Sequence, residues 1–447
     1  MVSYLFTQTY LEVVFMPTVS QWREALGSGH YDRSLAYLYG EDGVFAARTR
    51  YLRVIDGYVA TFGEPSDLRL FSAPGRTEIG GNHTDHNHGR TLAASVDMDV
   101  IAAVEATDGD IAVQSEGYPM DRVSPWELQA VEEEKGRSVS LVRGLAARFA
   151  HFGWEIGGFN AYTISSVPKG SGLSSSAAYE VLLATVLNAL YNDGSISRLE
   201  LAKASQYAEC VYYGKPCGLL DQTASSVGGI VTMDFADPTD PAVESVAVKF
   251  DDFGLSLCVV DAHADHADLT DEYAAVTREM KAVSQQLGVQ FLRETDYASL
   301  LADMPAVRAS CGDRAVLRAL HFFAEDARVP QQVDALRSGD VATFLKLIKE
   351  SGNSSFEYLQ NVYPCGATTA QALAVALAVA QSELGDEGAW RVHGGGFGGT
   401  ILCFVPHTKT ADFVRCMDAI FGKDSCRVLR IRPIGGAELG GDHVMSV

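Results

Sequence analysis

The stretch PKGSGLSSSAAYEVLLATVLNAL, residues 168–190, decides how the rest of the chain is interpreted. An alternating apolar segment at 159–164 predicts a strand just before it, which the proline and glycines then break. After the loop, apolar residues recur at near-helical spacing until Asn192-Asp193-Gly194 ends the pattern. The stretch therefore predicts a glycine- and serine-rich loop that opens onto the N-terminus of a helix with a buried face.

Such a loop can hold an anion. The first N–H groups of a helix have no partner within the helix, and the helix dipole adds positive potential there. Gly170 and Gly172 let the backbone approach a phosphate, and the hydroxyls of Ser174, Ser175 and Ser176 can bond phosphate oxygens or ligate Mg²⁺. Glycines and serines also cap helices without any ligand, and for an isolated loop this is the commoner case. The lysine precedes the glycines, so this is not the P-loop of nucleotide hydrolases.

Composition limits the function classes. The 447 residues are enough for two domains at ~150 residues each. Acidic residues number 57 against 35 basic ones, and the resulting net charge of −22 repels nucleic acid and anionic membranes, so neither is expected as a partner. The eight cysteines form no C-x-x-C pair and are expected to be reduced thiols in a cytoplasmic protein. Neither a signal peptide nor a membrane span is expected.

Strands and helices interleave without a regular βαβ rhythm, which predicts an α+β fold. Expected strands are 100–106, 110–115, 229–235, 255–261, 400–405 and 426–433, and expected helices are 140–152, 272–287, 330–337, 341–351, 368–384 and 409–421. The composition around 237–241 marks the best domain boundary. We therefore expect an N-terminal extension at 1–40, an N-terminal domain at 41–240 and a C-terminal domain at 241–447.

One carboxylate stands in an unusual place. Ser197-Arg198-Leu199-Glu200 is a capping box that starts a helix ending near Gly214. Glu209 lies beside the apolar stripe of this helix, where a carboxylate needs a partner. A metal ligand and an ordinary solvated carboxylate both remain open for Glu209.

Three stretches occur in a recognisable order: APGRTEIGGNHTDHNHG at 73–89, PKGSGLSSSAA at 168–178 and RVHGGGFGGT at 391–400. They resemble the galactokinase branch of the galacto-, homoserine, mevalonate and phosphomevalonate kinase superfamily. The segment ECVYYGKPCGLLDQ at 209–222 looks like the part of that branch that carries the catalytic aspartate. The resemblance spans roughly residues 40 to 447 and implies a two-lobed fold with the active site in the cleft between the lobes.

The resemblance also implies an activity: ATP-dependent phosphoryl transfer, with Mg²⁺, to a sugar hydroxyl, typically the anomeric one. Asp221 matches the residue that takes or orients the hydroxyl proton, and Arg76 matches its basic partner. Ser176 and Glu209 match the magnesium positions. The phosphate loop is matched by Gly170, Gly172, Leu173, Ser174, Ser175 and Ser176, and the sugar-binding set by Asn82, His83, Asp85, Gly218 and Tyr273. The glycine run 394–399 should close over the site from the second domain.

The first motif departs from the family pattern. Galactokinases usually read PGRVNLIGEHTDY, so here Asn82 replaces a glutamate, Glu78 replaces an asparagine and His86 replaces a tyrosine. An amide can donate as well as accept hydrogen bonds, whereas a carboxylate only accepts. Asn82 would therefore tolerate an anionic sugar. Galactose is the first expected substrate, and galacturonate or another galacto-configured sugar is the second.

Two further interpretations stay open. The same fold could phosphorylate mevalonate or homoserine, although the segment around His83 and the match at Tyr273 favour a sugar. Alternatively, the chain could be a non-catalytic sugar-sensing regulator, against which the presence of both Asp221 and Arg76 argues. In each case the expected partners are small molecules, and the protein is expected to be a monomer or a weak homo-oligomer.

Overall fold

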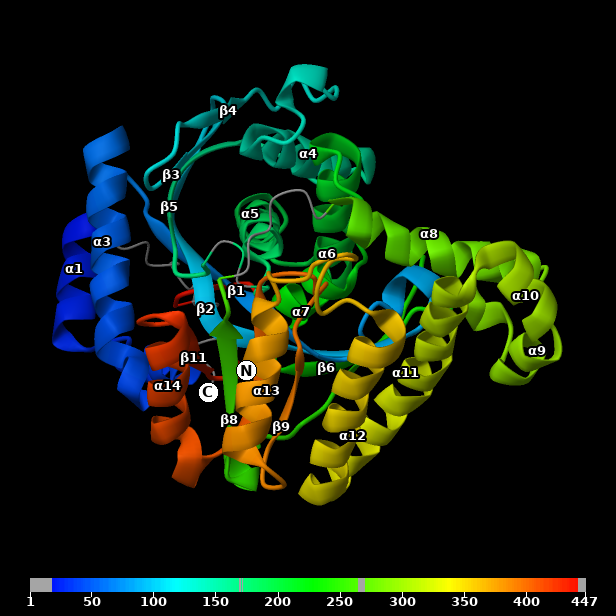
Figure 1. Ribbon diagram of the computed structural model, residues 1–447. Helices are drawn as coiled ribbons and strands as arrows, with labels where there is room; N and C mark the ends of the chain where they lie inside the picture. Colours follow the sequence, from blue (N-terminus) through cyan, green and yellow to red (C-terminus); the bar gives the residue numbers. More distant parts are fainter. Residues whose placement is uncertain (1–17, 169, 171, 264–269, 441–447) are drawn as a thin grey trace, which may run out of the picture.

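The computed structural model describes residues 18–168, 170, 172–263 and 270–440, and these contain two β-sheets (Figure 1). The larger sheet has eight strands, in the order β12-β1-β2-β5-β3-β4, with β6 paired to β2 and β7 to β6. Its strands are β1 (Arg69–Gly80), β2 (Arg90–Thr107), β3 (Ile111–Ser115), β4 (Asp121–Val123), β5 (Gly158–Ser165), β6 (Ile230–Asp234), β7 (Ala242–Ser245) and β12 (Ala437–Glu438). The smaller sheet has the order β11-β8-β10-β9. Its strands are β8 (Leu255–Asp261), β9 (Ala389–Val392), β10 (Thr400–Pro406) and β11 (Cys426–Leu429).

The larger sheet is covered by helices on both faces. Successive side chains of a strand point to opposite faces, and along β2 Ile101 and Ala103 pack into one apolar cluster while Ala102 and Val104 pack into another. The first cluster is closed by α1 (Val19–Ser28), α2 (Asp32–Tyr39) and α3 (Val44–Phe62). The second is closed by α4 (Ser138–His151), α5 (Ser175–Tyr191) and α6 (Arg198–Tyr207). The near-continuous apolar sequence of β2 follows from this double burial.

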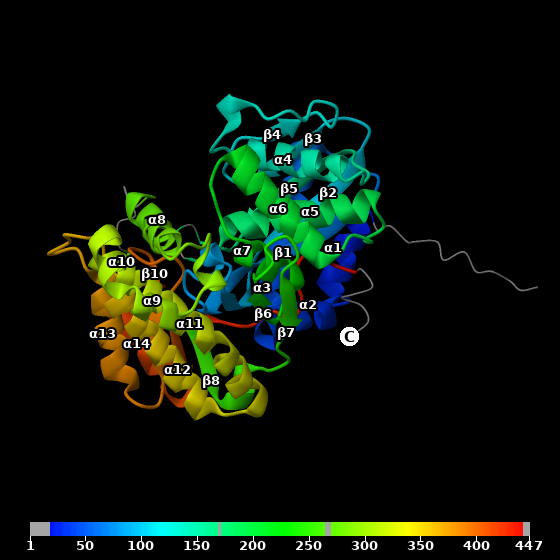
Figure 2. The ribbon, with the colours of Figure 1, turned by 90° about the vertical axis from the view of Figure 1, so that its right-hand side faces the viewer.

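Helix α7 (Leu220–Val227) packs on α5, α6, β1 and β2, and so belongs to the lobe of the larger sheet. The remaining helices form a second lobe together with the smaller sheet (Figure 2). They are α8 (Thr270–Gln286), α9 (Tyr297–Ala302), α10 (Met304–Cys311), α11 (Asp313–Ser338), α12 (Val341–Ser354), α13 (Ala372–Leu384) and α14 (His407–Phe421). Helices α12 and α13 pack on β9, and α14 packs on β8 and β10. The predicted mixture of helices and largely antiparallel strands is therefore confirmed.

Strand β1 carries the side chains around which the site is built. It pairs antiparallel with β2, but the register shifts once between Pro74 and Arg76 and again between Glu78 and Gly80. Such bulges bend a strand and re-aim its side chains. At the first bulge, the Arg76 N–H donates to the carbonyl of Leu173 (3.0 Å), so β1 is tied directly to the phosphate loop.

Segments outside the predicted N-terminal domain at 41–240 pack on the larger sheet or pair within it, which the sequence pattern did not predict. Trp22, from the stretch predicted to be an extension, is buried and donates its indole N–H to the Leu68 carbonyl (2.7 Å). From the second half of the chain, β7 and β12 pair within the larger sheet. The proposed division at 240 remains a prediction.

Some predicted elements differ from the structure. The strand predicted at 100–106 is the end of β2, which begins at Arg90. The helix predicted to start at Pro330 is part of α11, which begins at Asp313 and contains Pro330. The missing proline N–H removes one hydrogen bond, but the buried neighbours Phe322, Val329 and Val333 hold the helix continuous. The strand predicted to run to 433 ends with β11 at Leu429. Within the described ranges, no helix is both long and apolar enough to cross a membrane.

Candidate active site

Two adjoining cavities lie where the larger sheet meets the glycine loop that joins β9 to β10. We call the first, of about 260 Å³, the phosphate cavity, after the predicted phosphate loop; it is lined by Arg76, Pro168, Gly170, Gly172, Ser174, Ser175, Ser176, Lys215, Asp221, Gly394 and Gly395. We call the second, of about 230 Å³, the sugar cavity, after the residues predicted to bind a sugar; it is lined by Arg76, Glu78, His83, Asp85, His86, Lys215, Pro216, Cys217, Gly218, Leu220, Asp221, Tyr273, Gly394 and Gly395. The two share Arg76, Lys215, Asp221, Gly394 and Gly395, so three charged side chains stand where the cavities meet.

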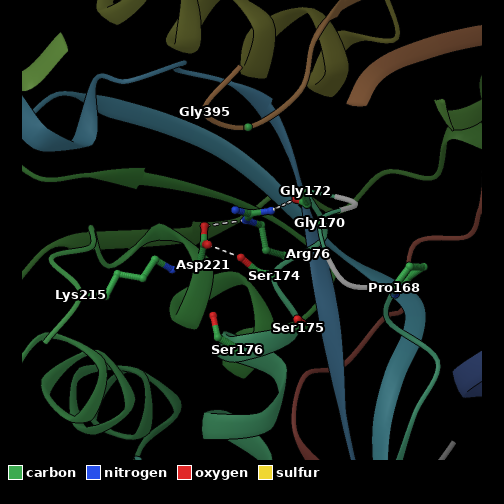
Figure 3. Close-up of a pocket in the computed structure, with 11 residues that line it drawn as sticks. Arg76, Pro168, Gly170, Gly172, Ser174, Ser175, Ser176, Lys215, Asp221 and Gly395 are labelled. Carbon is green, nitrogen blue, oxygen red and sulfur yellow. Dashed lines mark hydrogen bonds and ion pairs between the residues drawn. The ribbon is translucent and has the colours of Figure 1, made fainter. Parts of the chain in front are cut away.

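Arg76 and Asp221 form an ion pair at this junction (Figure 3). The Arg76 Nε donates to Asp221 Oδ1 at 2.6 Å, Nη1 donates to the Gly172 carbonyl, and Ser174 Oγ donates to Asp221 Oδ2. Burial raises the pKa of Asp221, but the Arg76 guanidinium and these hydrogen bonds outweigh it and hold that pKa below its usual range. Asp221 is therefore an ionised carboxylate at neutral pH.

The phosphate loop has the geometry that its sequence predicts. Gly170 and Gly172 have φ of 74° and 69°, in the left-handed region that favours glycine. A Cβ on Gly172 would lie 2.8 Å from Nδ1 of His393 and from Oγ1 of Thr400, so only glycine fits. Helix α5 begins at Ser175, and no side chain caps its N-terminus within the described part of the chain. Leu173 belongs to the same loop but does not line the phosphate cavity, because its side chain is fully buried in the core.

Glu209 is buried and tied to the phosphate cavity through Ser176. It lies in a π-helical turn, Ala208–Tyr213, which continues α6. Its Oε1 accepts from Ser176 Oγ (3.2 Å) and Lys215 Nζ (2.8 Å), and its Oε2 accepts from Gln222 Nε2 (2.8 Å). Burial lowers the pKa of Lys215, but Glu209 more than reverses this and raises it to about 12. Glu209 thus has the partners that its position beside an apolar stripe required.

Four of the five predicted sugar-binding residues line the sugar cavity: His83, Asp85, Gly218 and Tyr273. The pKa of His83 is lowered to about 3, chiefly by burial, so its imidazole is neutral and its Nε2 can donate to the Gly395 carbonyl (3.0 Å). The Tyr273 hydroxyl donates to the Gly396 carbonyl (2.8 Å). A Cβ on Gly218 would overlap the Asp85 carboxylate. Side chains from both lobes thus hold the glycine loop against the cavity.

Known proteins match this chain over most of its length. Family models match residues 56–106 (galactokinase galactose-binding signature), 140–229 (GHMP kinases N terminal domain) and 332–417 (GHMP kinases C terminal). A galactokinase of Streptomyces coelicolor is 32% identical over 377 residues, which cover 82% of this chain and 93% of that protein. A galactokinase of Lactococcus lactis is 29% identical over 372 residues, covering 81% and 90%. The chain belongs to the galactokinase family.

Solved structures agree with this fold. The crystal structure of Lactococcus lactis galactokinase complexed with galactose superposes with a TM-score of 0.75 at 22% identity, over 87% of this chain and 99% of that one. A mevalonate kinase from Methanococcus jannaschii superposes with a TM-score of 0.58 at 13% identity, over 82% and 99%. The predicted galactokinase family and the predicted phosphotransferase class are confirmed.

Within this galactokinase-family site, Asn82 is the predicted residue that does not line the sugar cavity. It is fully buried, its Nδ2 donates to Glu78 Oε1 (2.9 Å) and to the Gly394 carbonyl (2.7 Å), and its Oδ1 accepts from Asn361 Nδ2 (2.9 Å). Glu78 lines the cavity instead. The amide of Asn82 is thus occupied by protein groups.

Sequence reasoning also missed Lys215, which lines both cavities of the galactokinase-family site. The signal was available, because Lys215 stands inside the quoted stretch 209–222, between Gly214 and Pro216 and just beyond the end of a helix. Its ammonium bonds Glu209 and extends toward Asp221 (Figure 3). It therefore adds a cation to a protein that is strongly acidic overall.

Proposed function

We propose that this chain transfers the γ-phosphoryl group of ATP to the anomeric hydroxyl of galactose. The observation that carries the proposal is the Arg76–Asp221 ion pair at the junction of the phosphate and sugar cavities. Phosphoryl transfer needs the γ-phosphoryl and the acceptor hydroxyl to meet in line, and catalysis consists mostly of positioning and charge stabilisation. The names of the relatives, galactokinases from two bacteria, support galactose as the acceptor.

Asp221 would orient the sugar hydroxyl and accept its proton. The new bond forms between the sugar oxygen and the γ-phosphorus, the bond from that phosphorus to the oxygen of ADP breaks, and the proton passes to Asp221 and then to water. A carboxylate with a lowered pKa is a weak base, so the proton moves as the phosphoryl transfer proceeds. The Arg76 guanidinium would stabilise the charge on the transferring group.

The ATP phosphates fit the open N-terminus of α5. Its first-turn N–H groups face the phosphate cavity without a side-chain cap, and the hydroxyls of Ser174, Ser175 and Ser176 line the same wall. Lys215 would supply a positive charge beside them.

The oxygen donors fit Mg²⁺ at Ser176 and Glu209. The two side chains are in contact (3.2 Å), the Ser176 hydroxyl faces the cavity, and Mg²⁺ at kinase sites takes few protein ligands because phosphates and water complete its shell. When bound, the ion would neutralise phosphate charge. The exposed Lys215 side chain can move away from Glu209 when the cation arrives.

A neutral sugar fits better than an anionic one. The galacturonate alternative depended on an amide at position 82 facing the substrate, whereas away from the wall shared with Arg76 and Lys215 the sugar cavity is lined by the carboxylates of Glu78 and Asp85. A uronate would meet like charge there. We also propose that the protein acts in the cytoplasm as a monomer or weak homo-oligomer, in keeping with its unpaired cysteines and net charge of −22.

The test is ADP release with ATP, with and without Mg²⁺, over galactose, galacturonate, N-acetylgalactosamine, glucose and mevalonate, with the phosphorylated product identified by ³¹P NMR. We expect Mg²⁺-dependent formation of galactose 1-phosphate. Turnover of mevalonate or galacturonate in preference to galactose would refute the substrate. Tight galactose binding without any turnover would favour the sugar-sensing regulator.

A further inference from the structure

Glu78 is a buried carboxylate that opens onto the sugar cavity and has no role in the proposed reaction. Its side chain is 9% exposed, and that exposed part faces the cavity. Its Oε1 accepts from two donors, Asn82 Nδ2 at 2.9 Å and Arg391 Nη2 at 2.8 Å. No donor among the described residues bonds its Oε2. One oxygen is therefore fixed by the protein, and the other is available to a ligand.

The Glu78 carboxylate is held by two buried side chains, Asn82 and Arg391. Arg391 is fully buried, and besides Glu78 it donates to the Ile79 carbonyl (2.7 Å). Asn82 is equally buried and joins Glu78 to the Gly394 carbonyl of the loop that closes the cavity. Burial raises the pKa of the Glu78 carboxyl, and the Arg391 guanidinium beside it opposes that rise and offsets part of the cost of the buried charge. A carboxylate held in this way is suited to recognition because its orientation is set before the ligand arrives.

We propose that Glu78 is a specificity-determining residue, whose Oε2 accepts a hydrogen bond from a sugar hydroxyl other than the one that is phosphorylated. The inference rests on the proposed galactose kinase function. The hydroxyl that Glu78 contacts must differ from the one that is phosphorylated. Glu78 lines the sugar cavity but not the phosphate cavity, whereas the reacting hydroxyl lies at the wall that the two cavities share. Asn82 is then a positioning residue, which contacts Glu78 and not the sugar.

This assignment explains the departure in the first motif. The family pattern has an amide at position 78 and a carboxylate at position 82, and this chain has the reverse. The two side chains hydrogen-bond each other, so the exchange keeps the pair and keeps one carboxylate at the cavity. The substitution at position 82 thus leaves the charge of the sugar cavity in place.

Glu78→Gln tests the proposal, because the fixed oxygen decides how the amide will lie. Asn82 and Arg391 both donate to the Oε1 position, so the glutamine carbonyl oxygen must occupy it and the NH₂ group must face the sugar. The acceptor is thereby lost while the shape is kept. We expect kcat/KM for galactose to fall about 10- to 150-fold, the range for a hydrogen bond to a charged group, mostly through KM.

The decisive readout is a panel of 2-, 3-, 4- and 6-deoxygalactose. We expect one of them, which lacks the hydroxyl that Glu78 contacts, to react equally well with the wild type and Glu78→Gln, while the others keep the full loss. An equal loss with every sugar, or no loss, would overturn the proposal and make Glu78 simply the counterion of Arg391. Failure of the wild type to phosphorylate galactose would instead refute the proposed function.

Two further variants keep the test sound. Glu325→Gln is the matched control, because Glu325 is also a buried carboxylate paired with an arginine, Arg328, and accepts from the Gly81 N–H (3.0 Å), but lines neither cavity. It should lower the melting temperature without distinguishing the deoxy sugars. If Glu78→Gln does not fold, Glu78→Asp keeps the charge for Arg391 but withdraws it by one methylene, and it should show the same selective pattern.

Discussion

Asp221→Asn should abolish most of the turnover while leaving the site assembled. Asparagine has the same shape, its Oδ1 can still accept from Arg76 Nε, and its NH₂ can donate to Ser174 Oγ, which now donates to Asp221. What disappears is the negative charge that receives the hydroxyl proton. A positioned base contributes about 10²- to 10⁴-fold, or about 3–5 kcal/mol of barrier, so kcat should fall by that factor.

The assay is ADP release at saturating ATP, Mg²⁺ and galactose, beside a thermal melt and a direct measurement of galactose binding. Asp85→Asn is the matched control, because this carboxylate lines the sugar cavity but not the shared wall. It should raise the galactose KM more than it lowers kcat. A folded Asp221→Asn protein that keeps more than about a tenth of wild-type kcat would refute the base role, because that loss is far below the expected range.

Three other predictions concern stability, metal and thiol chemistry. Burial raises the pKa of Glu325, but neighbouring arginines lower it to about 2 from 4.5. Ionised Glu325 therefore contributes about 3 kcal/mol to the free energy of unfolding, and this contribution is complete above about pH 4.5 and lost as the pH falls toward 2. Denaturant titrations at pH 7 and pH 3 should show a smaller acid effect in Glu325→Gln, and an equal effect in both proteins would contradict this. Ser176→Ala and Glu209→Gln should each raise the Mg²⁺ concentration for half-maximal rate roughly 10-fold or more, and an unchanged Mg²⁺ titration at fixed ATP would exclude the metal site. The pKa of Cys210 is lowered by its hydrogen bond with Cys217 (Sγ–Sγ 3.6 Å), so iodoacetamide at pH 7 should alkylate Cys210 more slowly in Cys217→Ala; peptide mass spectrometry gives both rates, and equal rates would refute the lowered pKa.

The phosphate loop could be predicted from sequence because its determinants are local. Left-handed glycines, a serine run and the start of an apolar helix all lie within residues 168–190, and each restricts the backbone by itself. That Glu209 has a polar partner could be predicted for a similar reason, since a carboxylate beside an apolar stripe must find a partner nearby. Pro330 shows the opposite case: its local preference predicted a helix start, but packing along α11 outweighed it.

The sugar cavity was harder to predict because its side chains are aimed by distant partners. Whether position 78 or position 82 reaches the cavity depends on the register shift in β1 and on Arg391 and Asn361, which lie about 300 residues further along the chain. A bulge redirects side chains without leaving a mark in the hydrophobic pattern. Asp221 and Arg76 match the family pattern and form one contact, so the proposed function keeps the family roles at these two positions. At positions 78 and 82 the residue types are exchanged while the contact between the two side chains is kept, so position alone does not decide which residue takes the family role.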